Sequence, residues 1–395
     1  MQLIRHVVGI IEIVIFIYLA LNVLYILVFA IAGVLRDKKS NWCFTRFRHI
    51  TLLITAYKED FIIESIIKSA LQQDYPSENI EIILIADSFT SQTIESLKAY
   101  QIKLVIAKLN ESTKVYSMQL ALKYLSTKTD FVVVLDADNV MEKGFLRKLN
   151  LSFASGFRVF QCHRTAKNTN SSFALLDAIS EEVNNNIFRE GQRALGLSAA
   201  LIGSAIAFEI DIYNQFIPNL KAIGGFDKEL ELELMKSQIK IEYLSDAYVY
   251  DEKVADSQAF YNQRRRWISA QLFYLGKSIL SSLSSLFFHG NVELFNKTLQ
   301  FSLFPRAMLL GTLITMNFIH LFFEPTTFSF LWLLMLILCS IAILISIPLH
   351  FYTKQTMKAI LSLPVAFLLM VLILFRLKKA NKKFIHTEHH YKSYL

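Results

Sequence analysis

Apolar residues gather at the two ends of the chain and leave a mixed, patterned middle. At the N-terminal end, residues Ile13 to Leu35 include no charged side chain. A helix of this length, rising ~1.5 Å per residue, crosses a hydrocarbon core of ~30 Å. The basic residues that follow, which favour the cytoplasmic side of a membrane, are Arg36, Lys38, Lys39, Arg46 and Arg48. The pattern therefore predicts a retained transmembrane helix whose C-terminal end is cytoplasmic.

From about residue 49, short apolar runs alternate with stretches that have helical spacing. The predicted strands span residues 50–57, 80–87, 103–109 and 131–135, with further short strands at 157–162, 201–209 and 241–250. The predicted helices span residues 61–72, 91–100 and 114–126, and residues 171 to about 200. Strand–helix alternation of this kind predicts an α/β domain built on a doubly wound, mostly parallel sheet.

The C-terminal third is aromatic, basic and apolar. Residues 258–288 are predicted to form amphipathic helices on a membrane surface, and three spans are expected at about 307–323, 328–349 and 359–377. A basic tail follows, comprising Arg376, Lys378, Lys379, Lys382 and Lys383. Three spans after a cytoplasmic domain would place this tail outside, against the positive-inside tendency. Either one span is interfacial or re-entrant, or the charge rule fails here.

The predicted organisation is an N-terminal helix and basic flank (1–48), an α/β catalytic domain (49–257), interface helices (258–298) and a C-terminal membrane region with its basic tail (299–395). Cys43, Cys162 and Cys339 lie far apart, so neither a zinc site nor a disulfide framework is indicated. Much of the net charge of +8 lies beside the apolar spans. This placement favours contact with membrane lipid over binding of nucleic acid.

The first candidate for chemistry is a pair of acids at the end of a buried strand. Residues 131–135 are all apolar, and Asp136 and Asp138 follow them directly. Ligands of open α/β sheets bind at the carboxyl ends of such strands. Two adjacent carboxylates repel each other unless a cation or a proton offsets their charge, and Mg²⁺ or Mn²⁺ carrying a pyrophosphate would do so. A polar turn that uses Asp as a helix cap is the alternative.

Two further candidates belong to the same predicted edge of the sheet. Asp87 ends the second strand and is either a helix cap or an acceptor for a nucleobase N–H. Lys114 begins a helix, where a cation together with the helix N-terminus could reach a diphosphate, although a plain surface lysine fits the local sequence equally well.

The remaining candidates are acidic and basic residues between positions 227 and 267. Asp227, Glu229 and Glu231 lie in an acidic helix start, which either complements the helix dipole or supplies a general base for an acceptor hydroxyl. The run from Gln263 to Trp267 is either a juxtamembrane basic cluster or a binding element. In the second case Arg266 clamps a pyrophosphate and Trp267 offers a flat face to a sugar ring.

Taken together, these pieces resemble membrane-bound family 2 glycosyltransferases with a GT-A fold, the group that includes cellulose, chitin, hyaluronan and poly-N-acetylglucosamine synthases. The stretch 53–59 is similar to the group's opening strand and Ala-Tyr-x-Glu turn. The stretch 86–93 is similar to its uridine-binding turn, and Asp136-Ala-Asp138 to its DxD motif. Gln263 to Trp267 matches QxxRW in full, and the tail at 387–389 is similar to the group's C-terminal Thr-Pro-His.

The resemblance implies an inverting glycosyltransferase that uses a nucleotide-sugar donor, expected to be a UDP-sugar, and Mg²⁺ or Mn²⁺. Asp87 would bind uracil, Asp136 the donor and Asp138 the metal, while Arg266 would contact the diphosphate. The expected donor-binding residues also include Ala56, Tyr57, Glu59 and Lys114. Gln263 and Trp267 are expected at the acceptor.

Two departures from the group's pattern bear on the reaction. The group's base lies in a Thr-Glu-Asp motif; an ungapped match puts Asp227 in that position, and a gapped match prefers Glu229 or Glu231. Residues 203–206 stand where the group often has a Gly-Ser-Gly loop near the acceptor.

The expected acceptor is a glycan or polysaccharide at the cytoplasmic face of the inner membrane, with a polyprenyl-phosphate or ceramide lipid as the alternative. A membrane-anchored nucleotide-sugar sensor without turnover is a different class of function, supported by the loss of the Thr-Glu-Asp form. A transporter is disfavoured because the predicted spans lack buried charges.

Overall fold

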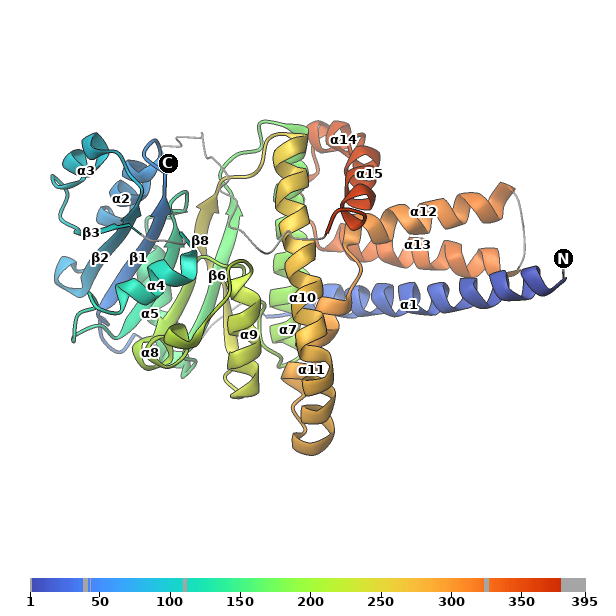
Figure 1. Ribbon diagram of the computed structural model, residues 1–395, viewed down its shortest axis with the longest axis horizontal. Coiled ribbons are helices and arrows are strands. Elements are labelled where there is room, and N and C mark those ends of the chain that lie inside the picture. Colours follow the sequence, from blue (N-terminus) through green and yellow to red (C-terminus); the bar gives the residue numbers. More distant parts are fainter. Residues whose placement is uncertain (1, 38–41, 43, 109–111, 323–326, 378–395) are drawn as a thin grey trace.

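The computed structural model describes residues 2–37, 42, 44–108, 112–322 and 327–377. Its centre is an eight-stranded sheet in the order β3-β2-β1-β4-β7-β6-β8-β5 (Figure 1). The strands are β1 (Ile50–Tyr57), β2 (Ile80–Asp87), β3 (Lys103–Ala107), β4 (Phe131–Asp136), β5 (Val140–Met141), β6 (Val159–Ala166), β7 (Ile206–Glu209) and β8 (Ile241–Asp251). Strands β1 to β4 pair in parallel, β6 pairs in parallel with β8, and β7 is antiparallel to both of its neighbours. The predicted α/β, mostly parallel architecture is confirmed.

Helices cover both faces of the sheet, because the central strands are apolar on both sides. On one face, Leu52 and Ile54 of β1 pack against α2 (Ile63–Leu71) and α5 (Phe145–Ser152). On the other face, Leu53 packs in a cluster with α4 (Lys114–Ala121), α8 (Ile210–Phe216) and α9 (Phe226–Lys236). The helices α10 (Ser257–His289) and α11 (Val292–Ser302) contribute Tyr274 and Leu294 to this second cluster. Thus α10 and α11 are anchored to the catalytic domain rather than standing apart from it.

Several predicted boundaries differ from the structure. The strand expected at 201–209 begins only at Ile206. The strand expected at 103–109 ends at Ala107, and its last predicted residue, 109, lies outside the described residues. The helix expected over 171–200 is α6 (Ser172–Asn184), followed by a π-helical segment (Asn185–Glu190) and α7 (Gly191–Ala194). Strand β5 and helices α3 (Ser91–Leu97), α5 and α8 complete the domain; of these, only α3 was expected.

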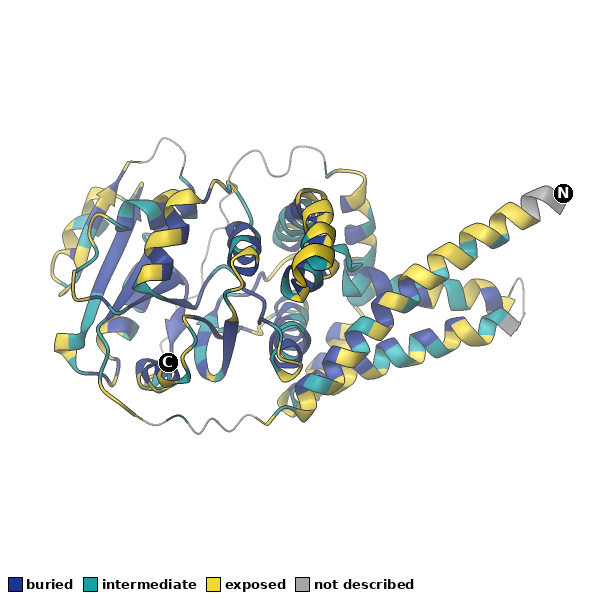
Figure 2. Ribbon diagram, turned by 90° about the horizontal axis from the view of Figure 1, so that it is seen from below, coloured by how far each residue is buried: buried dark blue, intermediate teal, exposed yellow. Residues whose placement is uncertain are grey.

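Three helices form a bundle that projects from the catalytic domain: α1 (Gln2–Leu35), α12 (Arg306–Phe322) and α13 (Thr327–Ile345) (Figure 1). Their shared core contains Val23, Leu313 and Trp332, all fully buried. Apolar side chains of α1 stay exposed along its outer stretch (Figure 2). By length and composition, the stretches His6–Leu35 and Phe328–Ile345 suit a membrane crossing; two more candidate spans result if the bent pairs α11–α12 and α14–α15 each count as one.

The third predicted C-terminal span, 359–377, is not a single helix. It is divided between α14 (Lys354–Ile360) and α15 (Leu363–Leu374), which meet at an angle of 41°. Pro364 lies in the first turn of α15, where its missing N–H costs no helical hydrogen bond. Figure 1 shows α15 running across the direction of α12 and α13. The basic tail predicted from Lys378 onward, Lys38, Lys39, Cys43 and the tail motif at 387–389 lie outside the described residues.

Helix α1 begins eleven residues before the predicted span of 13–35 and so includes Glu12. Glu12 accepts a hydrogen bond from Trp332 Nε1 at 3.0 Å and pairs with His320 Nε2 at 2.7 Å. An ionisable side chain therefore joins α1 to both α12 and α13.

Candidate active site

A cavity of about 530 Å³ lies at the carboxyl ends of β1, β2 and β4. Ten residues singled out from the sequence line it: Ala56, Tyr57, Glu59, Asp87, Lys114, Asp136, Asp138, Gln263, Arg266 and Trp267. They come from the ends of β1, β2 and β4, the start of α4, and α10. Parallel strands bring their carboxyl ends to one edge, and α10 closes that edge from the side of the helical bundle.

The ends of β1 and β2 are fixed to each other. Tyr57 pairs with Asp87 in the sheet, and the Lys58 N–H donates to the Asp87 carbonyl at 3.1 Å. The next residue of each strand end, Lys58 and Ser88, has a positive φ of 56° and 60°, a conformation that side chains other than glycine rarely adopt. Such backbone strain is concentrated at functional sites. The backbone therefore turns sharply after both β1 and β2, at the edge of the cavity.

Asp87 is only 2% exposed. Its Oδ1 accepts a hydrogen bond from the Ser88 hydroxyl at 3.0 Å, whereas Oδ2 is buried and has no hydrogen-bond partner among the described residues. A buried acceptor without a donor is costly. Asp87 does not cap the following helix; Thr90 does that by accepting the Thr93 N–H. The arrangement suits an N–H group of a ligand in the cavity.

Lys114 begins α4 and reaches across the cavity. Its ammonium group pairs with Asp136 and donates to the Gly203 carbonyl at 2.6 Å. It also lies 5.5 Å from the centre of the Phe226 ring. Lys114 therefore joins Asp136 at the end of β4, the 203–206 loop and the start of α9, so it is not a plain surface lysine.

Asp138 is held more rigidly than Asp136. It is 3% exposed; its Oδ2 accepts the Glu252 N–H at 3.0 Å, and its Oδ1 accepts from Asn139 Nδ2 at 3.2 Å. The described residues include no group of three or more His, Cys, Asp or Glu that could hold a metal ion. Mg²⁺ binds through one or two carboxylates and takes its other ligands from phosphate and water. The carboxylates of Asp136 and Asp138 meet this requirement. They do not meet that of a metal ion that needs three or more side-chain ligands.

The side of the cavity next to the helical bundle is formed by α10. Burial lowers the pKa of the Arg266 guanidinium, as expected for a desolvated cation that would gain from an anion. Gln263 presents a buried Oε1 that has no hydrogen-bond partner among the described residues. Arg264 stacks on Trp267, with its guanidinium carbon 4.4 Å from the ring centre, and pairs with Asp177 of α6. The guanidinium group of Arg264 therefore covers one face of the Trp267 ring.

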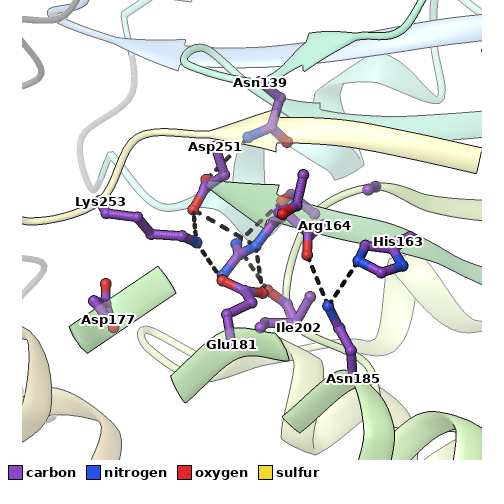
Figure 3. A network of polar contacts seen from close by, with 12 residues as sticks. Asn139, His163, Arg164, Asp177, Glu181, Asn185, Ile202, Asp251 and Lys253 are labelled. Carbon is purple, nitrogen blue, oxygen red and sulfur yellow. Dashed lines mark hydrogen bonds and ion pairs between the residues drawn. The ribbon is translucent and has the colours of Figure 1, made fainter. Parts of the chain in front are cut away.

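Four buried charged residues form a cluster beside the cavity (Figure 3): Arg164, Glu181, Asp251 and Lys253. All but Glu181 line the cavity. Arg164 donates to Glu181 at 3.0 Å, and Lys253 pairs with Asp251 at 2.8 Å and with Glu181. Burial opposes ionisation of both acids, but Arg164 and Lys253 outweigh it and hold the pKa of each carboxyl below its usual range. The sequence interpretation missed this cluster.

The three acids of α9 have different surroundings, and none of them lines the cavity. Glu229 accepts the N–H groups of Lys221 and Ala222 at 2.9 and 2.8 Å. Glu231 is 1% exposed and bound by Leu201 N–H and Lys297. Asp227 pairs with its neighbour Lys228 at 3.4 Å and adjoins Phe226, whose ring contacts Lys114. Glu229 and Glu231 thus have structural partners.

Comparison with known proteins identifies the family. The model of a family described as "Glycosyltransferase like family 2" matches residues 48–270, more than half of the chain. The chain belongs to glycosyltransferase family 2. The expectation of a glycosyltransferase is confirmed at this level, and the matched segment includes every candidate residue of the cavity.

Relatives within this glycosyltransferase family are distant. A beta-monoglucosyldiacylglycerol synthase of Synechocystis sp. is 25% identical over 232 residues, 55% of this chain and 47% of that protein. The probable glycosyltransferase YdaM of Bacillus subtilis is 23% identical, over 55% of this chain and 54% of that protein. The chain thus matches about half the length of these curated relatives. Among solved structures, a mannosyltransferase of Pyrobaculum calidifontis in complex with GDP-Man and Mn²⁺ has 14% identity and a TM-score of 0.49, covering 80% of this chain and 92% of that one.

Proposed function

We propose that this glycosyltransferase moves a sugar from a UDP-sugar to a hydroxyl group of a membrane lipid, with inversion at the anomeric carbon. The observation that carries the proposal is the cavity itself. It gathers the buried carboxylate of Asp87, the acids Asp136 and Asp138 at the end of β4, and the cations Lys114 and Arg266, of which Arg266 lies on α10.

The donor would lie across the strand ends. Asp87 Oδ2, buried without a partner among the described residues, would accept the uracil N–H, next to Ala56, Tyr57 and Glu59 of the same edge. Lys114 and Arg266 would contact the diphosphate, and Asp136 and Asp138 would hold Mg²⁺ or Mn²⁺. A divalent ion bound there would neutralise charge that develops on the leaving diphosphate.

Asp227 would be the general base. Its competitors Glu229 and Glu231 bind backbone N–H groups and would lose those contacts in order to act. Asp227 begins α9 beside Phe226, whose ring faces Lys114 at the cavity. It would take the proton of the acceptor hydroxyl as that oxygen attacks the anomeric carbon and UDP departs.

A lipid acceptor is favoured over a growing polysaccharide. Val254 and Ala259 line the cavity and also pack in an apolar cluster with α12 and α15. Residues of the cavity wall therefore pack against α12 and α15. Gln263 and Trp267 lie on the same side of the cavity. Buried side chains fill the core between α1, α12 and α13. Two relatives named as beta-monoglucosyldiacylglycerol synthases, from Synechocystis sp. and Nostoc sp., support the same choice.

The proposed location is the inner membrane, with the catalytic domain on the cytoplasmic face. We place α1, α12 and α13 across the bilayer and α14–α15 on the catalytic side. Arg265 of α10 donates to the carbonyl of Arg376, just after α15, at 2.8 Å, and α14 packs against α6. Both ends of the α14–α15 segment thus adjoin catalytic helices, and the basic tail stays cytoplasmic, in agreement with the positive-inside tendency.

Single cysteines at Lys354 and Arg376, on a background without native cysteines, test this topology. Both should react with a membrane-impermeant maleimide only when the cytoplasmic face is open. Labelling of the Arg376 position from outside in intact cells would instead make α14–α15 a fourth span.

The proposed reaction is tested by incubating purified protein in detergent with Mn²⁺, a panel of nucleotide sugars and diacylglycerol. UDP release that depends on diacylglycerol, with a glycolipid detected by mass spectrometry, is the expected result. Turnover only with an oligosaccharide acceptor would overturn the lipid assignment, and donor binding without turnover on any acceptor would leave a nucleotide-sugar sensor.

A further inference from the structure

The amide of Asn139 lies between the Asp136–Asp138 pair at the end of β4 and the buried charged cluster. Its Oδ1 accepts the Asp136 N–H at 3.1 Å, and its Nδ2 donates to Asp138 Oδ1 at 3.2 Å and to Asp251 Oδ1 at 3.1 Å. Asn139 is completely buried. Its side chain is therefore held by three groups, and it binds the backbone of Asp136 and the carboxylate of Asp138.

Asp251 is fixed in turn by two buried cations (Figure 3). Lys253 Nζ lies 2.8 Å from Asp251 Oδ2, and Arg164 Nε lies 3.6 Å from the same atom. The acceptor that orients the Asn139 amide therefore has little freedom to rotate. The backbone after Asp251 adds a second restraint, because the Glu252 N–H holds the other oxygen of Asp138.

The cluster also reaches the other parts of the active site. Arg164 donates to the Ser204 hydroxyl at 3.3 Å, in the 203–206 loop that Lys114 contacts. Glu181 lies one helical turn from Asp177, which pairs with Arg264 of α10. One buried network thus links the acid pair, the 203–206 loop and the helix that carries Gln263 and Arg266.

We propose that Asn139 and Asp251 are positioning residues that hold the Asp138 carboxylate in the orientation needed to bind a divalent cation together with the donor diphosphate. The inference rests on the proposed function, since it assigns Asp138 to a metal. Two features support it: each oxygen of Asp138 accepts a hydrogen bond, from Asn139 Nδ2 or from the Glu252 N–H, and the Asn139 amide is itself held by Asp251. Partners that orient metal-binding carboxylates are worth about 10- to 100-fold in metal affinity.

The test measures binding rather than turnover. Mn²⁺ is titrated into the detergent-purified full chain at a saturating concentration of UDP, and free Mn²⁺ is followed by electron paramagnetic resonance. Asn139→Ala removes the amide without changing any charge, and Asp251→Asn keeps an oxygen but removes the ion pairs. Glu182→Gln is the matched control, because Glu182 is a buried acid of α6 that binds His163 and Thr165 instead.

Wild-type protein should bind Mn²⁺ with UDP, Asn139→Ala and Asp251→Asn should bind at least tenfold more weakly, and Glu182→Gln should stay within twofold of wild type. The UDP affinity without Mn²⁺ should be unchanged in all three variants, a result that general misfolding would not give. If Asp251→Asn does not fold, Asn139→Ala carries the test.

Wild-type-like Mn²⁺ binding by Asn139→Ala would overturn the inference and leave the proposed function standing. Failure of the wild-type protein itself to bind Mn²⁺ with UDP would instead remove the metal from the proposed function.

Discussion

A buried ion pair joins the membrane-side helix α11 to α9, and its removal should destabilise the protein strongly. Lys297 is 4% exposed and lies 2.5 Å from Glu231, which is 1% exposed. In Lys297→Met the Glu231 carboxylate would keep only the Leu201 N–H. Leaving one buried charge without its partner costs about 3–5 kcal/mol. We expect a loss of that size in the free energy of unfolding.

The loss should depend on pH in a defined direction. Burial raises the pKa of Glu231 above its ordinary value of 4.5 even with Lys297 present, and without the lysine the pKa rises further. An acid whose pKa is raised on folding destabilises the folded state once the pH exceeds its unfolded pKa. The free energy of unfolding of Lys297→Met should therefore be closer to that of wild type at pH 5 than at pH 8.

Pulse proteolysis in urea, on protein in detergent, gives the unfolding free energies. The partner variant Glu231→Gln keeps an acceptor for Leu201 but removes the charge, so the double variant should recover most of the loss. If the two single losses simply add, or if Lys297→Met costs less than about 1 kcal/mol at pH 8, the ion pair is not what joins the helices.

Three other predictions concern the site and its attachment to α1. Asp138→Asn should weaken Mn²⁺-dependent donor binding by more than tenfold, measured by titration calorimetry; unchanged affinity would remove the metal assignment. Asp227→Asn should leave donor binding intact and slow transfer by about 10²–10⁴-fold, and a rate near wild type would move the base elsewhere. Burial opposes ionisation of Glu242, but Arg193 and Arg36 lower its pKa below 4.5. Its contribution to stability is therefore complete above pH 4.5 and lost as pH falls, so the thermal midpoint of wild type should drop below that pH more steeply than that of Glu242→Gln.

The strands that carry the donor side could be predicted because they are apolar on both faces. The runs at 50–57 and 80–87 have clear polar ends and match β1 and β2 in full. The same reasoning failed at residues 201–205. Leu201, Ile202 and Ala205 are apolar, but Leu201 donates its N–H to Glu231, so the segment is a loop held by a side chain. A contact with an acid thirty positions away has no local signal.

The buried charges escaped prediction for a related reason. Arg164, Glu181, Asp251 and Lys253 each look like an ordinary polar residue in their own segment. Only the parallel pairing of β6 with β8 brings Arg164 and Asp251 together, while α6 places Glu181 over them. Asp251 and Lys253, two residues apart after a strand, were the one pattern that sequence alone offered.

Transfer of a sugar to a membrane lipid in this cavity can be measured by supplying a radiolabelled UDP-sugar, Mn²⁺ and diacylglycerol to the purified protein and counting label in the organic phase. We expect organic-soluble label that disappears in both Asp138→Asn and Asp227→Asn. Label found only in a water-soluble polymer, or organic-soluble label that persists in both variants, would contradict it.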